Sequence, residues 1–152
     1  MPTDRQVSEA VRTELDREPR LPHADEVAVD AYGDGYVTLR GTVGSFAQQT
    51  AAVKAAHRAP GVAGVYDELQ VRLLDDDRRR DAEIRGHALE RLMWDASLPT
   101  ESIEAHVSDG WLTLTGNVDY QYQSDLAFAD VANVRGVVGV TNQIRVNEVL
   151  VA

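Results

Sequence analysis

Residues 35–43 read GYVTLRGTV and residues 110–118 read GWLTLTGNV, so one pattern occurs twice at a spacing of 75 residues. Five of the nine positions are identical in the two stretches. After its first glycine, each stretch alternates apolar and polar residues, which is typical of a β-strand that buries one face. A repeat of this kind indicates that the chain contains two copies of one module.

Two further matches support a duplication. Residues 61–65 (GVAGV) return at the same spacing as residues 136–140 (GVVGV), and the pair Leu-Pro at 21–22 returns at 98–99. Because the matches keep the same order, we place one module in residues 1–74 and the second in residues 81–152. Residues 75–80 form a charged linker or the start of the next helix.

Each copy is expected to open with an amphipathic helix. Val7, Val11 and Leu15 recur every four residues after Thr3 and Gln6, which have the spacing of a capping box. The corresponding residues of the second copy are Ile84, Ala88 and Leu92. The proline of the Leu-Pro pair then disfavours further helix, because it disfavours the helical backbone conformation of the residue before it.

A β-hairpin is expected next. The pair Asp109-Gly110 favours a two-residue type I′ turn, in which both central residues need positive φ. That turn sets residues 107, 105 and 103 opposite residues 112, 114 and 116, so that the apolar side chains share one face. The first copy has the longer turn Gly33-Asp34-Gly35 at this place.

A second helix is expected at roughly residues 46–57 and a third strand through Leu69, Val71 and Leu73, with Ile144 and Val146 as counterparts. The fold class is therefore α+β, with two tandem αββαβ modules, each a three-stranded mixed sheet with two helices on one face. Six glycines are assigned to turns and helix ends, with Gly61 and Gly136 placed at a left-handed helix C-terminus. They are Gly35, Gly41, Gly61, Gly110, Gly116 and Gly136.

Composition restricts the function classes. The net charge is −10, of which the residues up to Leu74 carry −3 and the remainder −7. No basic patch is present, so nucleic-acid binding is not expected, and attraction to an anionic membrane is disfavoured. The first residues lack a leader pattern and no apolar stretch has the length of a membrane span, so a cytoplasmic location is expected.

The two hairpin stretches, 34–41 and 109–116, resemble the signature of the BON domain, which is named for a bacterial osmotically inducible periplasmic protein and for nodulation proteins. The endings at residues 61–71 and 136–146 fit the same family. The resemblance implies an αββαβ fold without known enzymatic activity. It also implies a stress-related module that interacts with membranes or phospholipids, and some such domains occur in potassium-binding and secretin-associated proteins.

A search for catalytic chemistry leads to the prediction that the protein is not an enzyme. The chain has no cysteine, and none of its four histidines has a second ligand at helical or hairpin spacing. No phosphate-binding glycine motif and no nucleophile elbow are present. We therefore expect no catalytic residues, no metal site and no cofactor.

Candidate binding residues come from differences between the copies. Met93 and Trp94 replace the charged pair Asp16 and Arg17, and Trp94 falls outside the buried stripe of its helix. Trp94 either contacts a partner or lipid, or packs against the other copy. A second group, Trp111, Tyr36, Thr38, Thr113 and Arg145, is expected on the sheet faces that the helices leave open. Tyr120 and Tyr122 are a further addition, replacing Ser45 and Ala47.

The leading hypothesis is a non-enzymatic, stress-related binding module that contacts a membrane or phospholipid surface or a protein partner. One alternative is a small-ligand or cation sensor, with K⁺ as the candidate ion and the oxygen-rich residues 30–34 as ligands. Another is self-association into a homo-oligomer through an open face or a sheet edge, extended by the apolar tail at residues 149–151.

Overall fold

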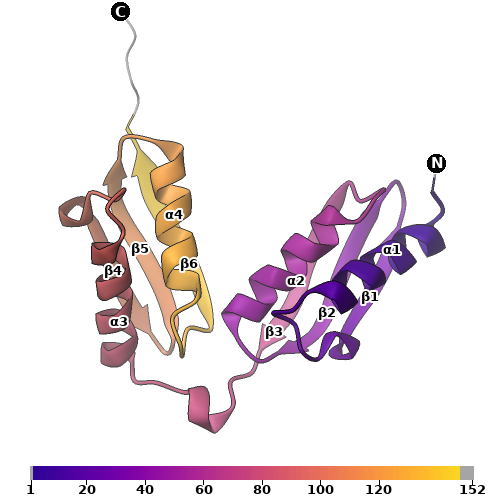
Figure 1. Cartoon of the computed structure of the whole chain (residues 1–152), viewed down its shortest axis with the longest axis horizontal. Helices are drawn as coiled ribbons and strands as arrows, with labels where there is room; N and C mark the ends of the chain where they lie inside the picture. The colour runs from indigo at the N-terminus through magenta and orange to yellow at the C-terminus, as the bar shows by residue number, and fades with distance from the viewer. Residues whose placement is uncertain (1, 148–152) are drawn as a thin grey trace, which may run out of the picture. The chain divides into compact units, whose positions relative to one another are not determined.

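The computed structural model describes residues 2–147, and the chain divides between Arg72 and Leu73 into two compact units. The first contains α1 (Asp4–Arg17), β1 (Val27–Tyr32), β2 (Tyr36–Val43), α2 (Phe46–Arg58) and β3 (Gly64–Val71) (Figure 1). The second contains α3 (Asp81–Trp94), β4 (Ile103–Ser108), β5 (Trp111–Val118), α4 (Gln121–Ala132) and β6 (Gly139–Val146). The predicted αββαβ order is therefore confirmed in both units.

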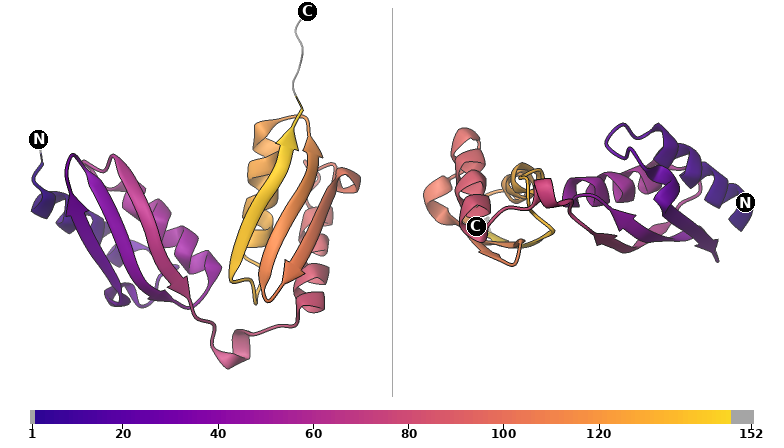
Figure 2. Two further views of the ribbon diagram at one scale, coloured as in Figure 1. Left: turned by 180° about the vertical axis from the view of Figure 1, so that it is seen from behind. Right: turned by 90° about the horizontal axis from the view of Figure 1, so that it is seen from below.

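Each module contains one three-stranded mixed sheet. The central strand pairs antiparallel with the first strand of its hairpin and parallel with the last strand, giving the orders β1-β2-β3 and β4-β5-β6. Both helices of a module cover the same face of its sheet, and the other face carries no helix (Figure 2). The fold class predicted from the repeat is confirmed.

The core of each module lies between the helices and the sheet. In α1 the predicted stripe of Val7, Val11 and Leu15 is buried, and in α3 the equivalent stripe of Ile84, Ala88 and Leu92 is buried. The α1 capping box is also present, with the Gln6 N–H donating to Thr3 Oγ1 at 3.2 Å and the Thr3 N–H donating to Gln6 Oε1 at 2.9 Å. None of the helices within residues 2–147 is both long and apolar enough to cross a membrane.

The second hairpin has the predicted register. Asp109 and Gly110 have φ values of +50° and +81°, as a type I′ turn requires. Residues 107, 105 and 103 lie opposite 112, 114 and 116. This register sends one set of side chains to the core and the alternate set to the open face of the sheet.

Three details differ from the sequence-based expectation. The strand expected to reach Leu73 ends at Val71. Gly61 and Gly136 have positive φ, but the helices end earlier, at Arg58 and Ala132. Residues 59–62 form a turn after α2, closed by the Val62 N–H donating to the Ala59 carbonyl at 3.4 Å. Gly61 is the third residue of this turn.

Gly41 and Gly116, expected in turns, lie within the central strands β2 and β5. Their φ values are +129° and +133°, and a Cβ at either position would overlap a backbone carbonyl oxygen, that of Glu26 or of Ser102. These carbonyls belong to the turn before the first hairpin strand. The glycines are therefore required by a close approach of two backbone segments.

Candidate functional site

The exposed aromatic and large apolar side chains form several groups on the described surface. They are Tyr32, Tyr36, Tyr66, Leu74, Met93, Trp94, Trp111, Tyr120 and Tyr122. Leu74 lies between β3 and α3, and the others belong to one helix end, one helix start and two open sheet faces. Seven of the nine are tyrosine or tryptophan, which combine a large apolar ring with a polar group.

The C-terminal end of α3 carries the largest exposed apolar group. Trp94 is 86% exposed and Met93 is 72% exposed, because the core of the module is contacted by the stripe that ends at Leu92. The corresponding end of α1 has Asp16 and Arg17. Met93 and Trp94 therefore lie where the sequence placed them, outside the buried stripe of their helix.

A hollow of about 610 Å³ lies beside Trp94. It is lined by Glu90, Arg91, Trp94, Asp95, Ala96, Ser97 and Asp130. The Ser97 N–H donates to Asp95 Oδ1 at 3.0 Å, and Asp130 Oδ2 is shielded from solvent. Two carboxyl groups thus approach each other where α3 ends against α4.

The Asp95–Asp130 pair can be held together by one shared proton. Burial, together with hydrogen bonding to Asp95, raises the pKa of Asp130 to about 7. The pKa of Asp95 is lowered, because Asp130 and the Ser97 N–H donate to its carboxylate. In the first module the equivalent of Asp95 is Glu18, whose pKa the Arg58 guanidinium lowers through a hydrogen bond of 2.9 Å.

Tyr120 and Tyr122 stack at the start of α4. Their ring centroids lie 5.7 Å apart with an interplanar angle of 17°. The Gln123 side chain accepts hydrogen bonds from the Asp119 and Tyr120 N–H groups at 3.0 and 3.1 Å, which fixes this end of the helix. Both rings are exposed, so the pair offers an aromatic surface where β5 and β6 end.

On the open face of the first module, three tyrosines surround Thr38. Tyr66 lies beside Thr38 in the register of β2 and β3, and Tyr32 lies opposite Tyr36. The ring of Tyr66 is 6.5 Å from that of Tyr32 and 6.3 Å from that of Tyr36. Thr38 lies on the open face, as the sequence predicted, but it is only 5% exposed and donates to the Tyr32 hydroxyl at 3.3 Å.

On the open face of the second module, one tryptophan takes the place of this cluster. The ring of Trp111 lies across Gly139 of the neighbouring strand, where a Cβ would overlap it. Its indole Nε1 donates to Thr141 Oγ1 at 2.7 Å, and its side chain is 49% exposed. Thr113 pairs with Thr141 on the same face, as the sequence predicted for this strand.

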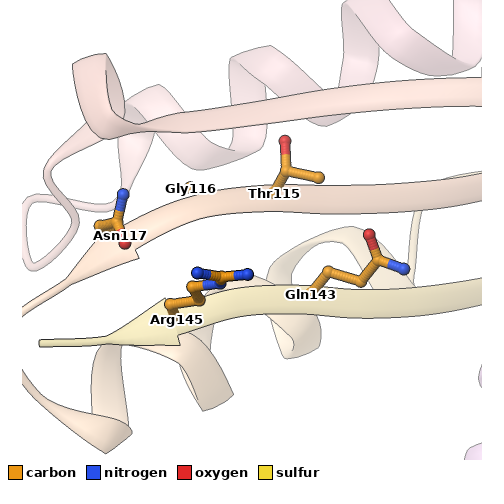
Figure 3. A pocket seen from close by; sticks show the side chains of 5 residues that line it. All are labelled: Thr115, Gly116, Asn117, Gln143 and Arg145. Carbon is orange, nitrogen blue, oxygen red and sulfur yellow. The ribbon is translucent and has the colours of Figure 1, made fainter.

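A polar hollow of about 600 Å³ lies farther along this face. It is lined by Thr115, Gly116, Asn117, Gln143 and Arg145. Figure 3 shows the side chains of Thr115 and Asn117 on β5 and of Gln143 and Arg145 on β6, all on one side of the sheet. The register sets Thr115 beside Gln143 and Asn117 beside Arg145.

The oxygen-rich residues at 30–34, considered above as ligands for K⁺, lie at the end of β1 and in the hairpin turn. Asp30 lies 3.7 Å from Arg40, which also contacts Glu68 at 3.1 Å. Residues 33–35 form the hairpin turn. Within residues 2–147 no group of three or more His, Cys, Asp or Glu side chains is arranged to hold a metal ion.

Comparison with known proteins identifies relatives of both modules. The BON domain family model matches residues 3–72 and again residues 80–148. Osmotically-inducible protein Y of Escherichia coli (strain K12) is 34% identical over 118 residues, which cover 72% of this chain. The chain spans 56% of the length of that relative.

Solved structures of CdsD, a structural protein of the type III secretion system of Chlamydia trachomatis, are also similar. The C-terminal domain of CdsD matches 97% of this chain and 68% of its own, with 10% identity and a TM-score of 0.39. A second CdsD structure matches 96% of this chain and 64% of its own, with 10% identity and a TM-score of 0.37.

The comparison corrects one expectation and supports the family assignment. The expectation of a cytoplasmic location is wrong, because osmotically-inducible protein Y is a periplasmic protein. The two family matches cover nearly all of the chain, and the resemblance seen in its hairpins is confirmed. The chain therefore belongs to the BON-domain family, with two BON domains in tandem, and is related to an osmotically inducible protein.

Proposed function

We propose that this protein is a non-enzymatic, stress-related binding module that contacts a phospholipid membrane surface through Met93 and Trp94. The observation that carries the proposal is the exposure of these neighbouring side chains at the end of α3. Their equivalents in the first module are charged, so the apolar group is a property of the second module. The family and the osmotically inducible relative support binding without catalysis.

The chemistry of the exposed residues favours the headgroup boundary of a membrane. Tryptophan and tyrosine are enriched at this boundary because their rings prefer the apolar side and their polar atoms the wet side. Burying Trp94 is worth about 1.5–3 kcal/mol, which contributes substantially to a small contact. The stacked Tyr120 and Tyr122 offer a second amphipathic contact on the same module.

Charge predicts how such binding depends on the lipid. The net charge of −10 repels anionic vesicles over long range, so the apolar contact has to supply the affinity. Added salt shortens the range of this repulsion, because charges are screened beyond the Debye length, which is about 10 Å at 0.1 M ionic strength. Association with anionic vesicles is therefore expected to strengthen with added salt or divalent ions.

Flotation of the whole chain with phosphatidylcholine vesicles tests the proposal. Wild type is expected to float, and Trp94→Ala is expected to lose most of the floated fraction while its denaturant midpoint stays unchanged. If wild type stays at the bottom of the gradient, the membrane proposal is wrong. The binding hypothesis then requires a protein partner that contacts Met93 and Trp94.

A further inference from the structure

The polar hollow on the open face of the second module contains Arg145, which has no acidic partner among residues 2–147. Arg145 forms no ion pair or hydrogen bond with any other group in residues 2–147. It is nevertheless surrounded by side chains that can donate hydrogen bonds, namely the amides of Asn117 and Gln143 and the hydroxyl of Thr115 (Figure 3). Arg145 is exposed, so its guanidinium is accessible to a ligand from solvent.

On the equivalent sheet face of the first module, the arginine forms ion pairs with two carboxylates. Arg40 has the strand position of Thr115, and it lies between Asp30 at 3.7 Å and Glu68 at 3.1 Å. The strand position of Glu68 is occupied in the second module by Gln143, which is neutral. Arg145 has the strand position of Gln70, so the second module carries its cation on the last strand and has no carboxylate at the position of Glu68.

Two carboxylates belong to this end of the sheet, those of Asp119 and Glu104, and neither forms an ion pair with Arg145 within residues 2–147. Asp119 accepts a hydrogen bond of 3.0 Å from the side chain of Asn147, two residues after Arg145. Glu104 lies on β4, beyond the central strand, opposite Thr115. Its carboxylate is 3.7 Å from His106 Nε2. The hollow around Arg145 on β6 therefore presents positive charge and neutral donors toward solvent.

This donor set matches a phosphate group. A guanidinium offers parallel N–H donors that fit two oxygens of a phosphate, and charge-assisted hydrogen bonds of this type are stronger than neutral ones. Amide N–H₂ and hydroxyl donors at the sides can reach the remaining oxygens, because a phosphate accepts in several directions at once.

We propose that Arg145, Asn117, Gln143 and Thr115 form a binding site for a phosphate group on the open face of the second module. The phosphate is either that of a phospholipid headgroup or free phosphate. The headgroup form rests on the proposed membrane function and deepens it, whereas the free form is independent of it. The site lies at the end of the module where Tyr120 begins the helix after β5.

Nuclear magnetic resonance of the whole chain tests the site with inorganic phosphate, titrated at constant ionic strength against chloride. Wild type is expected to show saturable shifts at the amides of residues 115–117 and 143–145. Arg145→Gln is expected to weaken binding about tenfold or more, the usual effect of removing a charged hydrogen-bond donor. The matched control is Arg40→Gln, which removes the same charge from the equivalent face of the first module and is expected to leave the shifts unchanged.

Two results would overturn the proposal: wild type without saturable shifts around Arg145, or equal weakening by Arg145→Gln and Arg40→Gln. Flotation with phosphatidylcholine vesicles then separates the sources. Weaker flotation of Arg145→Gln assigns the site to a headgroup, and unchanged flotation assigns it to free phosphate. Trp94→Ala is expected to lose flotation but to keep the chemical-shift changes caused by phosphate. Failure of the membrane proposal can therefore be distinguished from failure of the phosphate site.

Discussion

The carboxylate of Asp81 accepts hydrogen bonds from the backbone N–H groups of Asp109 and Gly110, at 2.9 and 3.0 Å. The first residue of α3 therefore holds the turn of the β4–β5 hairpin, 28 and 29 residues away in the chain. A carboxylate also suits the start of a helix, where the unpaired N–H groups carry partial positive charge. This single side chain links the helix layer of the second module to its sheet.

Removing this link is expected to destabilise the second module. Asp81→Ala leaves two turn N–H groups without their acceptor, and the free energy of unfolding is expected to fall by about 1–2 kcal/mol. Urea unfolding measures the change. The control is Asp4→Ala, at the equivalent first residue of α1 in the first module. If both variants lose the same stability, the contact with the hairpin turn is not the cause.

The surroundings of Gly116 and Gly86 predict opposite effects of an alanine substitution on the free energy of unfolding. Gly116→Ala is expected to cost more than 2 kcal/mol, because its Cβ would overlap the Ser102 carbonyl and its φ is positive. Gly86 lies within α3 and has no atom within 4 Å of an added Cβ. Gly86→Ala is therefore expected to stabilise by about 0.5–1 kcal/mol. Thermal unfolding of both variants tests this, and a destabilised Gly86→Ala would contradict it.

Local patterns in the sequence predict most of the fold. The capping box at Thr3 and the turn at Asp109-Gly110 involve residues within a few positions of each other, so their chemistry can be seen in the sequence. The role of Gly116 cannot be seen there, because it depends on a carbonyl 14 residues earlier that meets the strand only after folding. Its positive φ also occurs inside strand β5, whereas the sequence pattern assigned this glycine to a turn.

The exposed groups were predicted less completely. Met93, Trp94, Tyr120 and Tyr122 were found by comparing the two copies, and all four are exposed. The Tyr32–Tyr66 stack was missed, because it depends on the parallel register of β2 and β3. The outward alternation of β1 and β3 was a usable signal for both rings. The tail at residues 149–151, expected to add to a sheet edge, lies outside the described residues.

The Asp95–Asp130 pair predicts a pH-dependent stability. The pKa of Asp130 is about 7 in the folded chain and 3.8 is its ordinary value, so between these values the folded state binds more protons than the unfolded state. The free energy of unfolding is therefore expected to fall as the pH rises from about 4 to about 7. The lowered pKa of Asp95 acts in the opposite direction, but only at more acidic pH.

Asp130→Asn tests the pair. Replacing the carboxyl by a neutral amide is expected to flatten this pH dependence and to stabilise the chain by roughly 1 kcal/mol at pH 8. Asp125→Asn, an exposed position of the same helix, is expected to keep the wild-type profile. The test is the free energy of unfolding of each variant, measured by denaturant titration at several pH values from 4 to 8. Superimposable curves for wild type and Asp130→Asn would show that the two carboxyl groups do not share a proton.

The central claim is that Trp94 enters the membrane, and the fluorescence of that side chain tests it most directly. The chain has two tryptophans, so Trp111→Phe leaves Trp94 as the only reporter and Trp94→Phe leaves Trp111. With phosphatidylcholine vesicles that carry brominated acyl chains, Trp94 emission is expected to shift to the blue and to be quenched. Trp111, whose Nε1 is bonded to Thr141, is expected to be quenched far less. Trp94 emission that stays unquenched while the protein floats with the vesicles would contradict the claim.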